Sequence, residues 1–394
     1  MLKHVKKLNQ IALAKERIII GLMSGTSLDG LDIALCKLKG HGRQTELTCL
    51  QFKTVNYTTT LKNDIRQVFA KPIASLDKLC LLNAEIGQLH GEMITRTLTE
   101  WQVSPVNIDL IASHGQTVYH RPASLHGIGN QKNSTLQIGD GDHIAKQTGI
   151  ITLSDFRQKH IAHGGEGAPL AIYGDYLMLS SEKESRLLLN IGGIANLTFI
   201  PKNANFSDVI SSDIGPGNTI MDALAQEYKQ ISFDKDAEIA KQGQVNKPLL
   251  TSLMAHPFIH LPMPKTTGPE TFNIEWFKTH LKRLNLSKLG LPNQMATLNY
   301  YSAYCIAEII KSLSTDAKIY VSGGGAHNPV LMDNINSMIP SPIHSTEKLG
   351  INMDAKEAIL FAILANECVS GSDATFTNDK ISQPNVSMGK VSFP

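Results

Sequence analysis

The fold prediction for this chain rests on the stretch Gly21-Leu-Met-Ser-Gly-Thr-Ser-Leu-Asp-Gly-Leu-Asp32. It joins an apolar run at 18–20 to a strand-like run at 33–38, which predicts a β-hairpin. The connector holds three glycines, three hydroxyl side chains and two carboxylates. Glycine lets the backbone approach a ligand closely, and N–H and hydroxyl groups are donors for phosphoryl oxygens. We therefore interpret the hairpin as a nucleotide-phosphate loop, with Asp29 and Asp32 as candidate Mg²⁺ ligands.

Length and charge narrow the class of protein. The 394 residues are enough for two or three domains with sizeable cores. Lys and Arg number 37 against 35 Asp and Glu, so we expect neither a nucleic-acid nor a membrane partner. The apolar stretch 11–14 is too short for a secretory signal, and no run approaches the roughly 18 apolar residues of a membrane helix. The five cysteines are widely spaced and odd in number, which favours reduced thiols and a cytoplasmic location.

Strand-like and helix-like segments alternate along the chain, as in α/β proteins. The pattern predicts strands at 17–22, 33–39, 47–57, 110–113, 186–191, 195–200, 208–211 and 318–322. It predicts helices at 78–100, 219–228, 238–242, 297–313 and 354–368. From this order we expect an N-terminal extension at 1–16, an N-terminal lobe at 17–150 completed by the helix 354–368, a C-terminal lobe at 151–350 and a C-terminal tail at 371–394.

Two further glycine clusters follow predicted strands. Gly192 and Gly193 separate two strand-like runs, and Gly323, Gly324 and Gly325 follow another. Each cluster can offer backbone N–H groups to a polyphosphate, although the first, taken alone, is better explained as an ordinary hairpin turn. The chain has no Walker A loop and no protein-kinase catalytic loop. Two lobes with hairpin phosphate loops instead match the actin-like ATPases, in which nucleotide occupies the cleft between the lobes.

Two polar segments are candidates for chemistry. Asp213 lies at a predicted strand end before the turn Gly215–Asn218, so we interpret it as a general base, with a turn-organising Asp as the alternative. In the segment 155–169, Arg157 can bind an anion, and the carboxylates can accept hydrogen bonds from sugar hydroxyls. We interpret this segment as a substrate-binding wall, with a salt-bridged loop that binds no ligand as the alternative. The chain lacks the motifs of a catalytic zinc site and of a serine hydrolase.

These segments together closely resemble the anhydro-N-acetylmuramic acid kinases of bacterial cell-wall recycling. The matching pieces run in the family's order from about residue 18 to residue 365: 21–30, 113–117, 137–139, 155–157, 164–170, 189–193, 215–218, 323–325 and 357–358. The resemblance implies a two-lobed actin-like sugar-kinase fold, ATP with Mg²⁺ in the interlobe cleft, and a homodimer. It also implies that water opens the 1,6-anhydro ring while the released O6 takes the γ-phosphoryl group.

The residues and the resemblance assign three sets of site residues. Asp213 matches the aspartate that activates the water, and an exposed carboxylate near its usual pKa would suffice for that role. The expected nucleotide-binding residues are Gly21, Ser24, Gly25, Thr26, Ser27, Asp29, Gly30, Asn190, Gly192, Gly193, Gly215, Gly323, Gly324, Gly325 and Asn328. The expected substrate-binding residues are His114, Asp155, Arg157, Glu166, Gly167 and Glu357.

The chain departs from the family's pattern at His160, His163 and Glu166, where the family commonly has Asp, Ala and Gln. The segment 124–134 is also longer than usual. These changes leave open a kinase for a related sugar. A different class, an actin-like nucleotide-dependent binding or assembly protein, would need no sugar-binding wall. The presence of Asp155, Arg157, Asp213 and Glu357 argues against it.

Overall fold

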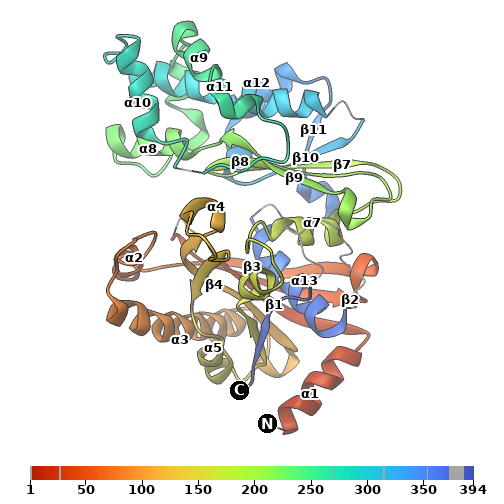
Figure 1. The fold of residues 1–394 in the computed structure, drawn as a ribbon. Helices are drawn as coiled ribbons and strands as arrows, with labels where there is room; N and C mark the ends of the chain where they lie inside the picture. Colours follow the sequence, from red (N-terminus) through yellow and green to blue (C-terminus); the bar gives the residue numbers. More distant parts are fainter. Residues whose placement is uncertain (1, 26–27, 269, 314–315, 353, 372–385) are drawn as a thin grey trace. The chain divides into compact units, whose positions relative to one another are not determined.

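The structure is a computed structural model, and it describes residues 2–25, 28–268, 270–313, 316–352, 354–371 and 386–394. The chain forms two compact units (Figure 1). Unit 1 comprises Met1–Leu179, Asn205–Ser207 and Ala355–Pro394, and unit 2 comprises Ser180–Ala204 and Asp208–Asp354. None of the helices in the described residues has the length and apolar content needed to span a membrane.

Unit 1 is built on a seven-stranded mixed sheet of order β12-β6-β4-β1-β2-β3, with β5 paired to β4. Its strands are β1 (Glu16–Ser24), β2 (Gly30–Lys39), β3 (Glu46–Asn56), β4 (Leu110–Arg121), β5 (Ser134–Ile138), β6 (Thr152–Ser154) and β12 (Lys390–Ser392). Strands β1, β2 and β3 are antiparallel, and β1, β4 and β6 run parallel. The expected β1–β2 hairpin is present, with Met23 opposite Asp32.

The helices of unit 1 supply the apolar faces that cover this sheet. They are α1 (Leu2–Leu13), α2 (Thr59–Arg66), α3 (Leu76–Glu100), α4 (Ala123–His126), α5 (Gly141–Thr148), α6 (Phe156–Ala162), α7 (Ala171–Leu179) and α13 (Lys356–Ser370). The regularly spaced apolar residues of α3, such as Ile86 and Ile94, enter one core with Ile20 and Leu22 of β1. Helix α13 packs on β1 so closely that a Cβ at Gly21 would lie 1.9 Å from the Ala358 carbonyl oxygen.

Unit 2 repeats this strand order on a smaller sheet. The order is β11-β10-β7-β8-β9, formed by β7 (Arg186–Ile191), β8 (Ile194–Ile200), β9 (Ile210–Pro216), β10 (Lys318–Ser322) and β11 (Ile343–Ser345). Strands β7, β8 and β9 are antiparallel, and β7, β10 and β11 run parallel. The series β3-β2-β1-β4-β6 in unit 1 therefore has the same order and directions as β9-β8-β7-β10-β11. This repetition confirms the predicted α/β class and the two similarly built lobes.

The helices of unit 2 form a separate core with its sheet. They are α8 (Thr219–Lys229), α9 (Lys247–Met254), α10 (Ile274–Arg283), α11 (Leu291–Ser312) and α12 (Pro329–Met338). Leu189 and Ile191 of β7 pack in this core with Phe277 of α10 and Leu298 of α11. The predicted helix 238–242 is a short 3-10 turn, Ala240–Gln242, rather than an α-helix.

The unit boundary differs from the expected one at residue 150. Residues 151–179 belong to unit 1: β6 pairs with β4 and β12, and Asp175 of α7 forms an ion pair of 2.8 Å with Lys356 of α13. Phe206, from the β8–β9 connection, also joins unit 1, where its ring lies 4.8 Å from that of Tyr173. Contacts between residues that are far apart in sequence thus set this boundary.

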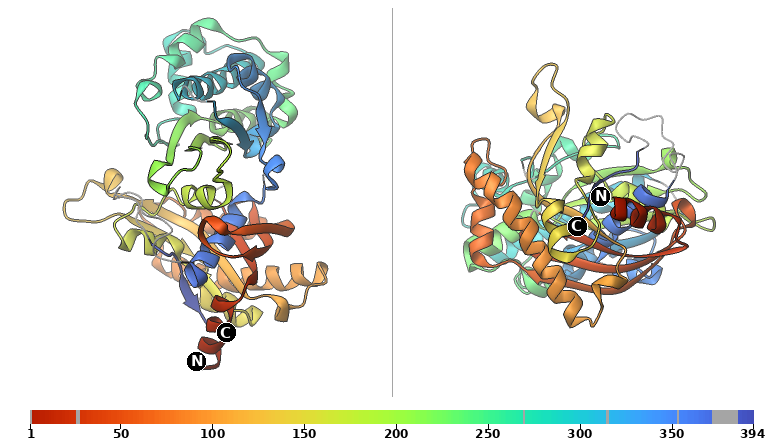
Figure 2. Two further views of the ribbon diagram at one scale, coloured as in Figure 1. Left: turned by 90° about the vertical axis from the view of Figure 1, so that its right-hand side faces the viewer. Right: turned by 90° about the horizontal axis from the view of Figure 1, so that it is seen from below.

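Both ends of the chain are structured parts of unit 1. The N-terminal extension is mostly helix α1, and the end of the C-terminal tail forms β12, which pairs antiparallel with β6. The rings of His4 and Phe393 stack 5.8 Å apart, so the two ends lie side by side (Figure 2). Residues 372–385 of the expected tail lie outside the described residues.

Candidate functional site

The connector of the β1–β2 hairpin is held by polar groups at its ends. Ser24 is 1% exposed; its hydroxyl donates to Gln116 Oε1 and accepts from Tyr57 Oη at 2.8 Å. The Ser24 hydroxyl is thus committed inside unit 1, whereas Gly25 is partly exposed. Thr26 and Ser27, both expected nucleotide contacts, lie outside the described residues.

The two flanking glycines of this motif have packing reasons to be glycine. Gly21 faces α13, as described above, and a Cβ at Gly30 would lie 2.3 Å from the Val55 carbonyl oxygen. Both contacts are within unit 1 and involve neighbouring backbone. The motif therefore serves the close packing of its hairpin as well as any ligand.

The two candidate Mg²⁺ ligands have different surroundings. Asp29 is exposed at the end of the connector, while Asp32 Oδ1 accepts a hydrogen bond of 2.6 Å from Thr54 Oγ1. Among the described residues, no group of three or more His, Cys, Asp or Glu side chains could hold a metal ion. This donor set fits an ion carried mainly by phosphate oxygens and water, for which Asp29 would supply one carboxylate.

Arg157, at the start of α6, is the centre of the polar wall in unit 1. Its Nε donates to His114 Nε2 at 2.8 Å and its Nη1 to the Gly167 carbonyl at 2.6 Å. Burial lowers the pKa of Arg157 to about 10, and the charge of Glu357 opposes this shift. The guanidinium therefore stays charged at neutral pH, and because Nη2 has no hydrogen-bond partner among the described residues it can donate to an anion.

His114 is used to position Arg157. Burial and the Arg157 charge lower the pKa of His114 well below its usual range, so the ring is neutral. Its Nε2 accepts from Arg157, so the proton lies on Nδ1, which donates to the Gly115 carbonyl at 2.8 Å. Both ring nitrogens of His114 are thus engaged within unit 1.

In the described part of the chain neither Asp155 nor Glu166 pairs with Arg157, whereas the charge of Glu357 does act on it. Asp155 pairs with Lys390 of β12, along a cavity of about 550 Å³ that lies within unit 1. Glu166 is partly exposed. His160 accepts the Gly167 N–H on Nδ1 at 2.9 Å, and its Nε2 lies 3.1 Å from Tyr173 Oη. His160, one of the departures from the family pattern, therefore supports the loop that holds Arg157.

Asp213 lies inside β9 of unit 2, opposite Asn196, and not at a strand end as expected. The segment beside β9 holds it in place: the Asp213 N–H donates to the Lys265 carbonyl, and Asp213 Oδ2 accepts the Thr267 N–H, both at 2.9 Å. Burial raises the pKa of Asp213 to about 6, although the Thr267 bond opposes the shift. Asp213 is thus partly buried with a raised pKa, in contrast to the exposed carboxylate of ordinary pKa considered above.

Three glycine turns of unit 2 are joined by backbone hydrogen bonds and close packing. The Gly217 N–H donates to the Gly193 carbonyl at 2.8 Å, and the Asn218 N–H to the Gly192 carbonyl at 2.9 Å. Gly323 has a φ of +86°, and a Cβ there would lie 2.6 Å from Asn190 Oδ1. The β7–β8 turn, the turn after β9 and the turn after β10 thus form one glycine-rich surface. Gly215 contributes to it from β9, opposite Ala195.

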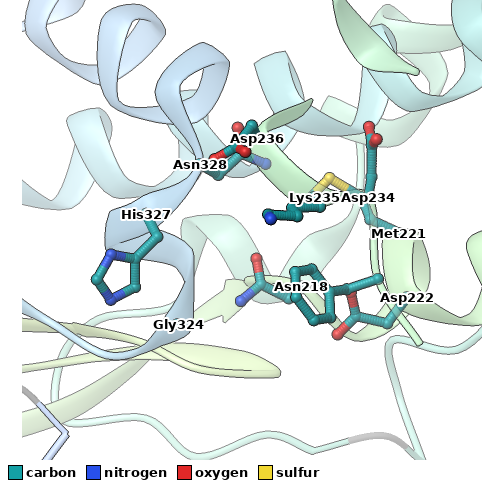
Figure 3. A pocket seen from close by; sticks show the side chains of 10 residues that line it. Asn218, Met221, Asp222, Asp234, Lys235, Asp236, Gly324, His327 and Asn328 are labelled. Atoms are coloured by element: carbon teal, nitrogen blue, oxygen red, sulfur yellow. The ribbon is translucent and has the colours of Figure 1, made fainter. Parts of the chain in front are cut away.

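A cavity of about 460 Å³ opens beside this surface in unit 2 (Figure 3). Its lining consists of Asn218, Met221, Asp222, Phe233, Asp234, Lys235, Asp236, Gly324, His327 and Asn328. The Asn218 amide does not cap α8, and Gly324 has only the Asn218 amide within 4 Å of its virtual Cβ. The lining combines two apolar side chains, Met221 and Phe233, with several polar and charged groups and open backbone, and a small polar molecule can use all three.

Most residues of this cavity were not expected from sequence. Gly324 and Asn328 were, whereas the segment 233–236 carries no motif. Asp222 lies one helical turn after Asn218 and therefore on the same side of α8. This spacing is the one feature of the sequence that could have placed Asp222 near the turn 215–218. Burial raises the pKa of Asp222 to about 7. Asn328 has a structural task as well, because its side chain caps α12 by accepting the Leu331 N–H.

Comparison with known proteins gives consistent matches over the whole chain. The family model described as anhydro-N-acetylmuramic acid kinase matches residues 17–392. A protein of that name from Pseudoalteromonas atlantica is 51% identical, over 100% of this chain and 100% of its own. Proteins of the same name from Pseudoalteromonas translucida and Caldanaerobacter subterraneus are 51% and 37% identical, over 99% and 96% of this chain and 99% and 98% of theirs.

Proposed function

Because the chain belongs to the anhydro-N-acetylmuramic acid kinase family, we propose that it converts 1,6-anhydro-N-acetylmuramic acid, ATP and water into N-acetylmuramic acid 6-phosphate and ADP. The family match over residues 17–392 carries this proposal. The reaction is a step of peptidoglycan recycling, in which a cell recovers the sugars of its own wall.

Asp213 acts as the general base in this proposal. It takes a proton from the water whose oxygen attacks the anomeric carbon, and the bond from that carbon to O6 breaks. O6 then attacks the γ-phosphorus of ATP, and the bond to the bridging oxygen breaks to release ADP. A carboxyl group with a pKa of about 6 is mostly ionised at neutral pH and is a stronger base than an ordinary aspartate. The Thr267 N–H fixes one carboxylate oxygen and leaves the other available.

ATP is held, in this proposal, by the glycine turns and the cavity of unit 2. The adenosine enters the cavity, where Met221 and Phe233 offer apolar surface and the amide of Asn218 is uncommitted. The backbone of Gly192, Gly193, Gly323 and Gly324 approaches the phosphates. The β1–β2 connector of unit 1 supplies further phosphate donors. Asp29 would supply a carboxylate to a Mg²⁺ ion bound with the nucleotide, and that ion would neutralise phosphate charge.

Arg157 and Glu357 carry sugar recognition in this proposal. The charged guanidinium of Arg157 is oriented by His114 and by the Gly167 carbonyl, and it pairs with the lactyl carboxylate of the substrate. Glu357, at the start of α13, accepts from a sugar hydroxyl. A related sugar remains the alternative substrate. An assembly protein is not favoured, because it would not require this oriented Arg157.

The cytoplasmic location and the homodimer expected from sequence are part of this proposal. ATP is an intracellular cosubstrate, which supports the location. Light scattering after gel filtration tests the dimer against the 43.0 kDa mass of one chain.

The test of the reaction uses ATP, Mg²⁺ and the anhydro sugar in ¹⁸O-labelled water, with the Asp213→Asn variant alongside. We expect ¹⁸O at the anomeric position, phosphate on O6, and loss of at least about 100-fold in kcat for the variant. Phosphorylation without ring opening, or a fully active variant, would overturn the mechanism. Turnover of only a different sugar would overturn the substrate assignment.

A further inference from the structure

A directional chain of hydrogen bonds runs through the interior of unit 1 toward the β1–β2 connector. The Gln116 amide fixes its direction, because Nε2 donates to the carbonyls of Gly25 at 3.3 Å and Thr117 at 3.2 Å. Its Oε1 is therefore the acceptor for the Ser24 hydroxyl. Ser24 uses its single proton there, so the 2.8 Å contact with Tyr57 Oη is a donation from Tyr57.

His90 is the origin of this chain. Its Nε2 lies 2.6 Å from Tyr57 Oη, and Tyr57 has already used its proton, so His90 must donate. Burial lowers the pKa of His90 to about 4, which keeps the ring neutral. Its Nδ1 then bears a lone pair, which is buried without a hydrogen-bond partner in the described structure. A buried histidine with an unsatisfied nitrogen is costly, so a role for the Nε2–H explains it better than packing does.

Tyr57 contacts both ends of the connector. Its side chain donates to Ser24, the last residue of β1, while its backbone N–H donates to the Asp29 carbonyl at 3.0 Å, directly before β2. Tyr57 is 4% exposed, and its ring stacks with that of His90 at a centroid distance of 6.0 Å. One buried residue outside the hairpin motif thus contacts the residues on both sides of the connector.

We propose that Tyr57 and His90 are positioning residues for the kinase reaction, which hold the β1–β2 connector ready for the polyphosphate of ATP. Neither residue touches the nucleotide in this proposal. They act through Ser24, Gln116 and the two ends of the connector. The proposal rests on the proposed function for its kinetic test but has a second test that does not.

The kinetic test compares Tyr57→Phe with Tyr320→Phe. Tyr320 is a matched control, because it is 5% exposed and its hydroxyl also donates one side-chain hydrogen bond, to Glu184 at 3.0 Å in unit 2. Loss of a buried partner leads us to expect an increase of about 5- to 50-fold in KM for ATP for Tyr57→Phe, with KM for the sugar changed less than about twofold. The control is expected to leave both KM values within about twofold. Equal loss of melting temperature in both variants with unchanged KM values would make Tyr57 merely structural and overturn the proposal.

A double-mutant cycle locates the effect. Ser24→Ala removes the same bond from its other end, so Tyr57→Phe combined with Ser24→Ala should cost no more than the worse single variant. If the two changes instead raise KM for ATP additively, and Ser24→Ala raises it far more than Tyr57→Phe, the Ser24 hydroxyl itself binds phosphate. That result would overturn the proposed series of hydrogen bonds. His90→Phe keeps a stacked ring without the donor and should raise KM for ATP in the same direction.

Amide hydrogen exchange and calorimetry separate this inference from the proposed reaction. In the unliganded protein, Tyr57→Phe should speed exchange of the connector amides at 24–30 by at least about fivefold, and it should weaken binding of the non-hydrolysable analogue ADPNP by a similar factor. These readouts stand even if the wild-type protein does not phosphorylate the anhydro sugar. Unchanged exchange and unchanged ADPNP affinity would overturn the inference while leaving the proposed function intact.

Discussion

Asp213 experiences two opposing influences on its pKa. Removal from water disfavours the charged carboxylate, whereas the Thr267 N–H favours it, and the nearby charge of Glu270 adds to the first influence. The outcome is a pKa of about 6, raised from the ordinary value of an aspartate. A base of this strength is better matched to water near neutral pH than an exposed aspartate would be.

The pH dependence of the rate follows from this value. The base must be ionised, so kcat/KM for the sugar should fall tenfold per pH unit below about pH 6, and it should be level from pH 7 to 8. If the base were an aspartate of ordinary pKa, kcat/KM would begin to fall only near pH 4. Initial rates from pH 4.5 to 8 check this, with pH-jump controls for stability. A level profile down to pH 4.5 would exclude Asp213 as the base, because kcat/KM reports ionisation of the free enzyme.

Arg157 should not tolerate a lysine. The guanidinium reaches His114 and the Gly167 carbonyl in two directions and still has a free donor, whereas one ammonium cannot reproduce that fork. We expect Arg157→Lys to lower kcat/KM for the sugar by about 10- to 100-fold, with KM for ATP changed less than about threefold. Arg186→Lys, at the ion pair with Glu184 in unit 2, is the control and should stay near wild type. A comparable loss in the control would point to stability instead of recognition.

A site residue could be predicted from the sequence when its own neighbours along the chain marked it, and not when its role came from a contact distant in sequence. Asp213 and Arg157 lie in segments whose polar and glycine-rich composition is itself the signal. Tyr57 and His90 lie 33 residues apart in sequence and meet only because β3 ends beside α3. No local pattern marks such a pair. Thr26 and Ser27 remain predictions from the motif alone.

At the level of elements, the hairpins were predictable and the strand ends were not. Glycines between two apolar runs specified both β1–β2 and β7–β8. Strand β4 was expected to end at 113 and continues to Arg121, because β5 offers it a partner from Gln116 onward. Strand β9 likewise includes Asp213, since β8 pairs with it through Gly215 and Pro216. Pairing partners distant in sequence thus extended strands past the points where apolar alternation stops.

Strand β12 should contribute measurably to the stability of unit 1. It pairs with β6, which has only three residues, and it adds an ion pair between Lys390 and Asp155. Deletion of residues 390–394 removes the backbone pairing and should lower the melting temperature by about 5 °C. Lys390→Met keeps the strand and removes one exposed ion pair, so it should shift the melting temperature by less than about 2 °C. Equal shifts in scanning calorimetry would assign the stabilisation to the ion pair.

At the level of the whole molecule, the repeated strand order was foreseen from two glycine hairpins, but the extent of each unit was not. Each unit has its own sheet and its own core. Residues 156–179 follow unit 1 because α7 contacts α13, which comes from the far end of the chain. Sequence order alone assigns such a segment to the wrong neighbour. In the proposed function the cavity of unit 2 takes the base, and phosphate contact by the β1–β2 connector of unit 1 is a separate prediction.

This division predicts a difference between adenosine and ATP. Adenosine has no phosphates, so it should slow amide exchange only around the cavity of unit 2, at 218–222, 233–236 and 324–328. ADPNP should protect the same segments and also the connector at 24–30 in unit 1. At about one hundred times its dissociation constant each ligand stabilises the state it binds by about 2.7 kcal/mol, which exchange mass spectrometry resolves. Because adenosine cannot reach a phosphate loop, protection of 24–30 by adenosine alone would contradict the assignment of the connector, and protection by neither ligand would remove it from the nucleotide site.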